Sequence, residues 1–292
     1  MRLPGASQSS ERAETVVANI GHVASDSLSS SRHHIVMAVF SRAVYLRPLH
    51  STDQQGPMCV LTPLDVPSGP LHARVHELPR FHPGQEVLCD DGWLHSAHQR
   101  VELPRMQWVP PPVDRLLARR RQAAQLLRKV LPRREVRDLA GAVVDVAGTV
   151  TDRGLGAGLA VLAGRGAGLT PAGDDCSAGI MLVTALLHRD GMDTYSPQDL
   201  SDLVIGYDSN DIARAFIGAA AQGECIEPLH LLLSACADGD RRAAMRHSSV
   251  LASVGHTSGL DVAYGALVGL ELADAIASDP GRCCAVSGDL RE

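Results

Sequence analysis

The stretch from Gly164 to Asp175 reads Gly-Arg-Gly-Ala-Gly-Leu-Thr-Pro-Ala-Gly-Asp-Asp and leads into an apolar segment that runs to His188. Its glycines let the backbone turn sharply and approach a ligand closely, and Pro171 stiffens it ahead of two adjacent carboxylates. Apolar residues then recur at helical spacing through residues 180–187. We therefore predict a loop that presents a helix start, where unpaired backbone N–H groups and the helix dipole favour anions.

A second loop of the same character lies near the C-terminus. Residues 255–261 read Gly-His-Thr-Ser-Gly-Leu-Asp and precede another helical pattern. If the two loops meet, their N–H groups and hydroxyls could bind an anion. Their carboxylates could bind a cation or a urea-like nitrogen. A structural interpretation stays open, because glycines also let helices pack closely and Thr, Ser and Asp are common N-caps.

The first third of the chain has the pattern of a small β-rich domain. Short runs of β-branched and aromatic residues occur at 35–40, 43–46 and 58–61. Residues 86–89 and 93–95 flank Asp90-Asp91-Gly92, a hairpin signal. With 292 residues, 45% of them apolar, the chain can bury a sizeable core. We expect a barrel or a sandwich over residues 32–108.

The pattern becomes helical after the stiff Pro110-Pro111-Pro112 link. We therefore predict the α+β fold class. The expected division of the chain is a mobile segment at 1–31, the β-rich domain at 32–108, a mainly α-helical domain at 109–280 and a mobile tail at 281–292. The segments expected to be helical are 113–131, 135–146, the residues after 175, 197–206, 211–222, 228–237, 241–253 and 260–276.

Charge and cysteine content narrow the class of protein. A net charge of −6 argues against a nucleic-acid partner, and we interpret the run Arg119-Arg120-Arg121 as a solvated helix face. The seven cysteines contain no C-x-x-C pair, so they signal neither a disulfide framework nor a zinc site. With no secretory h-region and no apolar run of about 20 residues, we expect a cytoplasmic protein without membrane contact.

Several classes of chemistry lack their motifs. Residues 154–158 resemble a nucleotide loop only superficially, because neither a Gly-Lys-Ser/Thr nor a clean βαβ context follows. The chain has no G-x-S-x-G elbow and no H-E-x-x-H motif. Cys176 falls within a predicted helix without a neighbouring histidine, so we interpret it as a buried small hydrophobe.

The two loops carry a resemblance to a known family. Residues 166–175 resemble the G-x-G-L-T-P-S/A-G-D-D signature of the AllH family, and residues 255–261 resemble its G-H-S/T-S-G-W-D element. The segment 213–223 with Glu227 is similar to a family helix that ends in A-A-x-G. The resemblance extends from about residue 33 to residue 275.

The resemblance implies a carbamoyltransferase-type enzyme, or a subunit of one, in nitrogen metabolism. Such a protein acts on a small amide or amine with phosphate or carbamoyl phosphate, and two loops could hold the anion. The alternative is a non-catalytic, small-anion-binding subunit of a multi-protein complex. Either way we expect a small anionic substrate, and we keep partner subunits and a homo-oligomer open.

The residues expected in the site follow from the two motifs. Substrate or anion binding is assigned to Arg165, Gly166, Gly168, Thr170, Gly173, Gly255, Thr257, Ser258 and Gly259. Catalysis is assigned to Asp174, Asp175, His256 and Asp261, and magnesium, the one cofactor considered, to Asp174 and Asp175. A lone loop histidine is also often structural, and Arg165 and Arg214 are equally compatible with surface roles.

The chain departs from the family pattern at specific positions. Leu260 stands where the family has tryptophan, and residues 208–211 read Asp-Ser-Asn-Asp where a Thr-rich start is expected. Ala167 replaces a frequent proline, and Cys176 an aromatic residue. We expect these positions to line the pocket, so the pattern is compatible with a different substrate.

Overall fold

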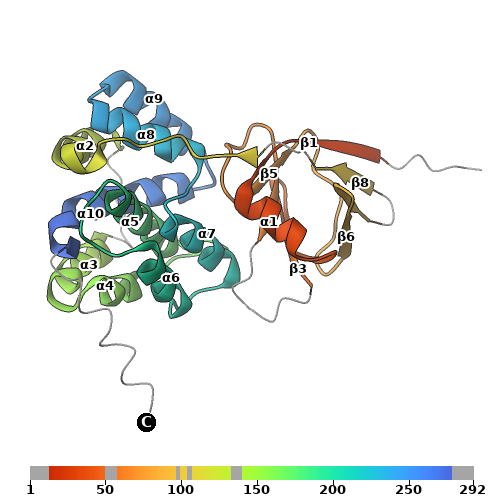
Figure 1. Ribbon diagram of the computed structural model, residues 1–292, viewed down its shortest axis with the longest axis horizontal. Helices are drawn as coiled ribbons and strands as arrows, with labels where there is room; N and C mark the ends of the chain where they lie inside the picture. The colour runs from red at the N-terminus through yellow and green to blue at the C-terminus, as the bar shows by residue number, and fades with distance from the viewer. Residues whose placement is uncertain (1–12, 50–57, 97–98, 104–106, 133–139, 278–292) are drawn as a thin grey trace, which may run out of the picture.

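The computed structural model describes residues 13–49, 58–96, 99–103, 107–132 and 140–277. Its strands gather at one end of the molecule and nearly all of its helices at the other (Figure 1). The predicted α+β class, with a β-rich N-terminal part and a mainly helical C-terminal part, is confirmed. The limits of the two domains stay a prediction, and the tail 281–292 lies outside the described residues.

The strands of the described residues form one curled sheet in the order β5-β4-β3-β2-β6-β7-β8-β1-β9. Their bounds are β1 (Ala13–Gly21), β2 (His33–Phe40), β3 (Ala43–Pro48), β4 (Cys59–Pro63), β5 (His72–Val75), β6 (Glu86–Asp90), β7 (Trp93–His95), β8 (Gln99–Glu102) and β9 (Gln107–Trp108). Because β1 also pairs with β5, the sheet closes on itself. A barrel therefore forms, rather than a sandwich.

Local sequence explains both the alternation and the turns of this barrel. On β3, Val44 and Leu46 are buried in the barrel core, whereas Tyr45 between them belongs to a second cluster on the outer face. Asp91 and Gly92 have φ of 47° and 80°, as a two-residue type I′ turn requires. The predicted hairpin of β6 and β7 is confirmed.

Residues 13–30 differ from the predicted mobile segment, because they form β1 and helix α1 (His22–Ser30). Ala24 and Leu28, one helical turn apart, are buried with the barrel core. Gly21 permits this close packing, since a Cβ there would lie 2.2 Å from the carbonyl oxygen of Pro70. The serine-rich composition concealed a helix whose few apolar residues need only the barrel as cover.

The helical part is built around α5 (Ala172–Arg189). Every residue of α5 from Cys176 to Leu187 is buried, as expected for a helix that packs on all sides. The helices that surround or extend this core are α2 (Leu116–Val130), α3 (Ala140–Arg153), α4 (Leu155–Leu162), α6 (Pro197–Ile205), α7 (Asp211–Ala221), α8 (Glu227–Asp238), α9 (Arg241–Leu251) and α10 (Ser258–Ala277). The described parts of the predicted helices are thus present.

Helix α4 was not predicted, because its glycines resembled a loop. Leu155, Leu159 and Leu162 repeat at helical spacing and are buried. A Cβ at Gly158 would lie 2.3 Å from the side chain of Val150 on α3. This glycine therefore serves close helix packing and not a nucleotide loop.

The two parts of the molecule share a buried interface. Met58, Val60 and Leu71 from the barrel form a cluster with Ile212 and Ala219 of α7, which in Figure 1 lies on the side of the helical part that faces the barrel. A backbone hydrogen bond of 2.8 Å from the amide of Glu227 to the carbonyl of Ser68 also joins them. The outer face of the barrel therefore forms one side of the interface between the barrel and the helical part.

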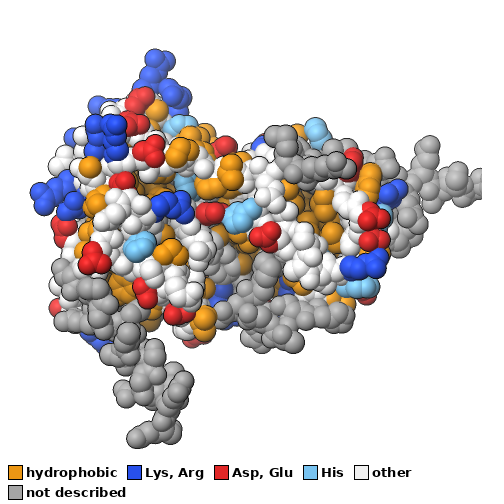
Figure 2. Space-filling view, viewed as in Figure 1, with side chains coloured by type: hydrophobic (Ala, Val, Ile, Leu, Met, Phe, Trp, Pro, Cys, Tyr) orange, Lys and Arg blue, Asp and Glu red, His pale blue; other side chains and the backbone are white. Residues whose placement is uncertain are grey.

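The basic side chains are unevenly distributed over the surface. Lys and Arg side chains gather at the end that holds α9 and α2 (Figure 2). On α2, Arg120 pairs with Asp274 at 2.5 Å and Arg128 pairs with Glu271, both acidic partners lying on α10. The basic residues of α2 are thus partly neutralised within the chain.

The five cysteines in the described part of the chain form no disulfide. Burial raises the pKa of Cys176 to about 12, which agrees with a small buried hydrophobe. Within the described ranges, no helix has the length and apolar character needed to cross a membrane.

Candidate functional site

The two Gly-rich loops lie side by side because the helices that they introduce pack with almost no space between their backbones. A Cβ at Gly265 of α10 would lie 1.9 Å from the carbonyl oxygen of Cys176 on α5, and one at Gly179 would lie 2.1 Å from that of Val262. The helix starts therefore meet, and the hydroxyls of Thr170 and Ser258 lie 3.1 Å apart. The expectation that both loops share one site fits this geometry.

Asp175 is the polar centre of this meeting point. Thr170 and Ser258 donate hydrogen bonds to its carboxyl group, while its Oδ2 atom is buried without a hydrogen-bond partner in the described structure. Burial raises the pKa of Asp175 well above its usual value; these hydrogen bonds oppose the shift, and the charges of Asp261 and Asp174 add to it. The environment thus favours the protonated carboxyl.

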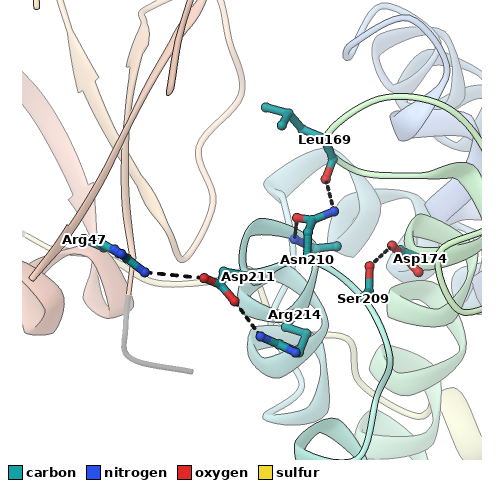
Figure 3. A network of polar contacts seen from close by, with 8 residues as sticks. Arg47, Leu169, Asp174, Ser209, Asn210, Asp211 and Arg214 are labelled. Atoms are coloured by element: carbon teal, nitrogen blue, oxygen red, sulfur yellow. Dashed lines mark hydrogen bonds and ion pairs between the residues drawn. The ribbon is translucent and has the colours of Figure 1, made fainter. Parts of the chain in front are cut away.

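Asp174, the adjacent carboxylate, has a different environment. Its Oδ1 accepts the backbone N–H of Gly164 and the hydroxyl of Tyr207, both at 2.8 Å, and its Oδ2 accepts the hydroxyl of Ser209. The side chain is fully buried, and it points towards Ser209 in Figure 3. Asp174 therefore fixes the loop to the start of α5 and is not free to bind a ligand.

A cavity of about 230 Å³ opens beside Asp175, between the helices and the barrel. On the barrel side, Tyr45, Val60 and His72 lie in register across β3, β4 and β5. The helical side contributes Thr170, Asp175, Ser258 and the ring of Phe216, so the cavity has apolar walls with a few polar groups. Its volume corresponds to roughly eight water molecules in the liquid, which is enough room for a small organic ligand.

Further polar groups of the cavity come from the connection between α7 and α8. A carboxyl oxygen of Glu224 lies 3.0 Å from Nδ1 of His22 on α1. Burial raises the pKa of the Glu224 carboxyl, and the charges of His22 and Arg189 oppose this shift. Burial also raises the pKa of the neighbouring Cys225 thiol to about 12. At neutral pH this wall therefore carries a thiol and not a thiolate.

His72 is the histidine that lines the cavity. Its Nδ1 lies 2.9 Å from the carbonyl oxygen of Pro67, and its ring meets the edge of Phe216 at 6.1 Å between centroids. Burial lowers the pKa of His72; the hydrogen bond to Pro67 opposes this shift and the charge of Arg74 adds to it. The ring is therefore neutral near pH 7.

A polar network holds the first loop against α7 and the barrel. Asn210 accepts the backbone N–H of Ala213 and so caps α7, and its side-chain amide donates to the carbonyl of Leu169 at 2.9 Å (Figure 3). Asp211 pairs with Arg47 of β3 at 3.5 Å and with Arg214 at 2.5 Å. Arg214 is thus engaged within the chain and not directed to an anion.

Five of the predicted site residues line the cavity: Thr170, Asp175, Gly255, Ser258 and Gly259. The others lie elsewhere. Four of them are exposed and lie outside the cavity: Arg165, Gly166, Gly168 and His256. The backbone carbonyl of Thr257 accepts N–H groups of the first turn of α10. The remaining three, Gly173, Asp174 and Asp261, are buried and do not line the cavity. The sequence therefore located the loops, but not which of their residues face the cavity.

The predicted use of backbone N–H groups at two glycines does not fit the structure. The N–H of Gly173 donates to the carbonyl of Arg165 at 2.8 Å, and that of Gly259 donates to the carbonyl of Val254 at 3.2 Å. A Cβ at either glycine would lie about 2 Å from a backbone oxygen. These glycines therefore serve packing, as the structural interpretation of the loops proposed.

The magnesium assignment to Asp174 and Asp175 does not fit either. Both oxygens of Asp174 already accept hydrogen bonds, as described above. Across the described ranges, no group of three or more His, Cys, Asp or Glu side chains is placed to hold a metal.

The positions that depart from the family pattern do not line the cavity, contrary to the prediction. Leu260 packs against the core of the helical part, and Cys176 is buried in α5. Ser209 and Asn210 serve the network around Asp174 and Leu169. Their replacement therefore changes how the loops are held and not the surface that a ligand would contact.

The barrel residues of the cavity were missed. Tyr45 and His72 occupy outward positions of the alternating β3 and β5 patterns, where polar side chains are ordinary. Only the packing of the helical part onto this face makes them part of a site. The same outward rows also carry Arg47 and Arg74, so a polar residue there was no signal of a site.

Comparison with known proteins bears on the second half of the chain. Residues 162–270 match the family model described as oxamate carbamoyltransferase subunit AllH. The matched segment contains both Gly-rich loops and helices α5 to α9, so the resemblance of this chain to the AllH family is confirmed there. No curated protein and no solved structure matches.

Proposed function

We propose that this chain is a carbamoyltransferase-associated subunit and that its cavity binds a small amide substrate. One observation carries the proposal: the two loops of the matched segment meet at Thr170 and Ser258 and place Asp175 in a cavity. Loops that only packed helices together would not need a buried carboxyl group with an unpartnered oxygen at their junction.

The chemistry of the cavity suits an amide. An amide offers a carbonyl acceptor and N–H donors, and the protonated carboxyl of Asp175 with the two hydroxyls can match both. Val60, Phe216 and Val262 supply apolar contact around these groups. Oxamate, which the matched family's description names, is an amide of a suitably small size.

A carboxylate on the substrate also finds a partner. Arg42 is the one arginine or lysine that lines the cavity in the described structure. It pairs with Asp65 at 2.9 Å, but both side chains are well exposed. Such surface pairs contribute little, so the guanidinium can turn towards an anionic ligand at small cost.

Of two roles, catalysis by this chain alone and substrate binding in a complex whose partner subunit supplies the phosphate site, the cavity favours the second. A phosphate dianion needs several positive groups or free N–H donors, whereas this cavity combines one arginine with two carboxyl groups, Asp175 and Glu224. In the reaction of carbamoyl phosphate with an amide, this chain would hold the amide and a partner subunit would hold the phosphate.

Calorimetric titration of the full chain tests the proposal. Oxamate should bind, and Ser258→Ala and Thr170→Val should each weaken binding about five- to tenfold through one lost hydrogen bond. Thr151→Val, at an exposed threonine of α3, is the matched control and should bind like the wild type. Absence of oxamate binding would contradict the proposal.

A second measurement separates the two roles. The full chain is assayed for carbamoyl transfer between carbamoyl phosphate and oxamate, alone and with candidate partner subunits. We expect turnover only in the mixture. Turnover by the chain alone would establish it as the catalytic subunit.

A further inference from the structure

His72 presents a defined hydrogen-bonding pattern to the cavity. A carbonyl oxygen can only accept a hydrogen bond, so the 2.9 Å contact with Pro67 makes Nδ1 the protonated nitrogen. In the neutral ring the lone pair then lies on Nε2. No hydrogen-bond partner reaches Nε2 from the described residues, although the ring lines the cavity.

The ring is held in a fixed position. Phe216 packs edge-on against it, and a Cβ at Gly69 would lie only 3.1 Å from Nδ1, so the backbone passes close beside it. Val60 lies beside His72 in the register of β4 and β5. A fixed acceptor with a free lone pair is suited to bind one N–H group in one direction.

The opposite wall supplies the complementary group. The buried Oδ2 of Asp175 has no hydrogen-bond partner in the described structure, and Thr170 and Ser258 donate to the same carboxyl group. The cavity thus offers an acceptor on the barrel side and a carboxyl group on the helical side. The other charged or titratable groups around it are Arg42, Tyr45, Arg74, Glu224 and Cys225.

We infer that His72 accepts an N–H of the bound substrate through Nε2, and that the cavity selects a primary amide whose carbonyl oxygen faces Asp175. This inference rests on the proposed function and adds to it a barrel residue that contacts the substrate. It also explains why the barrel is part of the site: without His72 the cavity has no neutral nitrogen acceptor opposite Asp175.

The same contact gives His72 a place in the transfer step. The amide nitrogen attacks the carbonyl carbon of carbamoyl phosphate, forming a C–N bond. The C–O bond to phosphate breaks, and phosphate leaves with that electron pair. The nitrogen loses one proton, which His72 Nε2 accepts.

Nitrogen NMR of the wild-type chain tests the contact without any substitution. With ¹⁵N-labelled histidine, Nε2 of His72 should show the signal of an unprotonated nitrogen, and oxamate should shift it towards that of a hydrogen-bonded one. His230 is an internal control, because its Nε2 already accepts the backbone N–H of Cys225 at 3.0 Å. An unchanged His72 signal in the oxamate-bound chain would overturn the inference.

Two variants sharpen the test. His72→Asn keeps a donor near Nδ1 for Pro67 but removes the acceptor, and it should weaken oxamate binding about tenfold. His72→Gln places an amide oxygen near Nε2, so it should bind more tightly than His72→Asn while slowing transfer in the assembled enzyme. His34→Gln is the control, since His34 is also buried, donates from Nε2 to the carbonyl of Ser27 and does not line the cavity.

The outcomes separate this inference from the proposed function. If the wild type binds oxamate and His72→Asn binds it equally well, His72 is not a contact, and the proposed function stands. If the wild type binds no oxamate, both are overturned. Equal transfer rates in wild type and His72→Gln would remove the proton-accepting role.

Discussion

At the scale of single residues, the two adjacent carboxyl groups at the start of α5 do different work. Asp174 accepts three hydrogen bonds inside the protein, whereas Asp175 has an unpartnered oxygen in the cavity. Neighbouring positions of a helix point about 100° apart, so one can hold the loop while the other faces a ligand. The sequence showed the pair but not this division.

Asp174→Asn should lower the free energy of unfolding by about 2–3 kcal/mol, because hydrogen bonds to a buried charged group are lost. Tyr207→Phe, which removes one of the three donors, should cost about 1 kcal/mol. Chemical denaturation measures both. If Asp174→Asn keeps wild-type stability and instead abolishes oxamate binding, the structural role is wrong.

Asp175 should make stability fall with rising pH. Its pKa is raised in the folded state, so from about pH 4 up to that raised pKa the native state binds more protons than the unfolded state. The unfolding free energy therefore decreases over this range. Asp175→Asn should remove that contribution and flatten the profile relative to the wild type.

The difference between the wild-type and Asp175→Asn profiles isolates this group, since Glu224 and the buried histidines contribute to both. Asp238→Asn, at an exposed carboxylate, serves as control and should follow the wild-type curve. A constant difference between wild type and Asp175→Asn across the range would contradict the raised pKa.

At the scale of elements, the glycines of α5 and α10 determine whether a site exists. Both loops come together because Gly179 and Gly265 let the two backbones touch. Moving α10 outward would separate Ser258 from Thr170 and open the cavity wall. Under the proposed function, helix packing and ligand binding are therefore coupled at this contact.

Gly265→Ala should destabilise the chain by about 3 kcal/mol, at the upper end of the usual cost of overpacking, because the new Cβ meets backbone. Gly148→Ala is the matched control: the glycine is helical with open space around it, so stability should rise by about 0.5–1 kcal/mol. Thermal and denaturant unfolding compare the two. Equal effects would show that the close contact does not matter.

The elements that could be predicted are those whose hydrophobic periodicity is visible within their own segment of the sequence. Strands β2, β3, β6 and β7 and the periodic helices followed from alternation and 3.6-residue spacing. Helices α1 and α4 could not be predicted, because serine and glycine conceal a helix whose stability comes from its neighbours: the barrel for Leu28, and Val150 for Gly158.

At the scale of the whole molecule, the barrel and the helical part each supply one wall of the cavity. Each loop motif could be recognised locally, and from the sequence we expected the two loops to form one site if they met. The barrel wall could not be predicted, because Tyr45 and His72 enter the site only through packing between segments more than 90 residues apart in the chain.

Amide hydrogen exchange should show whether both walls of the cavity contribute to ligand binding. Bound oxamate should slow amide exchange both in the loop around Thr170 and in strands β3 and β5, because opening either wall would release the ligand. Helix α3, which does not line the cavity, serves as the reference segment. Protection confined to the loops would mean that the helical part binds the ligand alone.

A crystal structure of the wild-type chain with oxamate tests the central claim most directly. We predict the ligand in the cavity between barrel and helices, with its amide between His72 and Asp175 and within hydrogen-bond distance of Ser258. Oxamate bound outside this cavity, for example at the basic end near α9, with the cavity closed by side chains, would contradict the account.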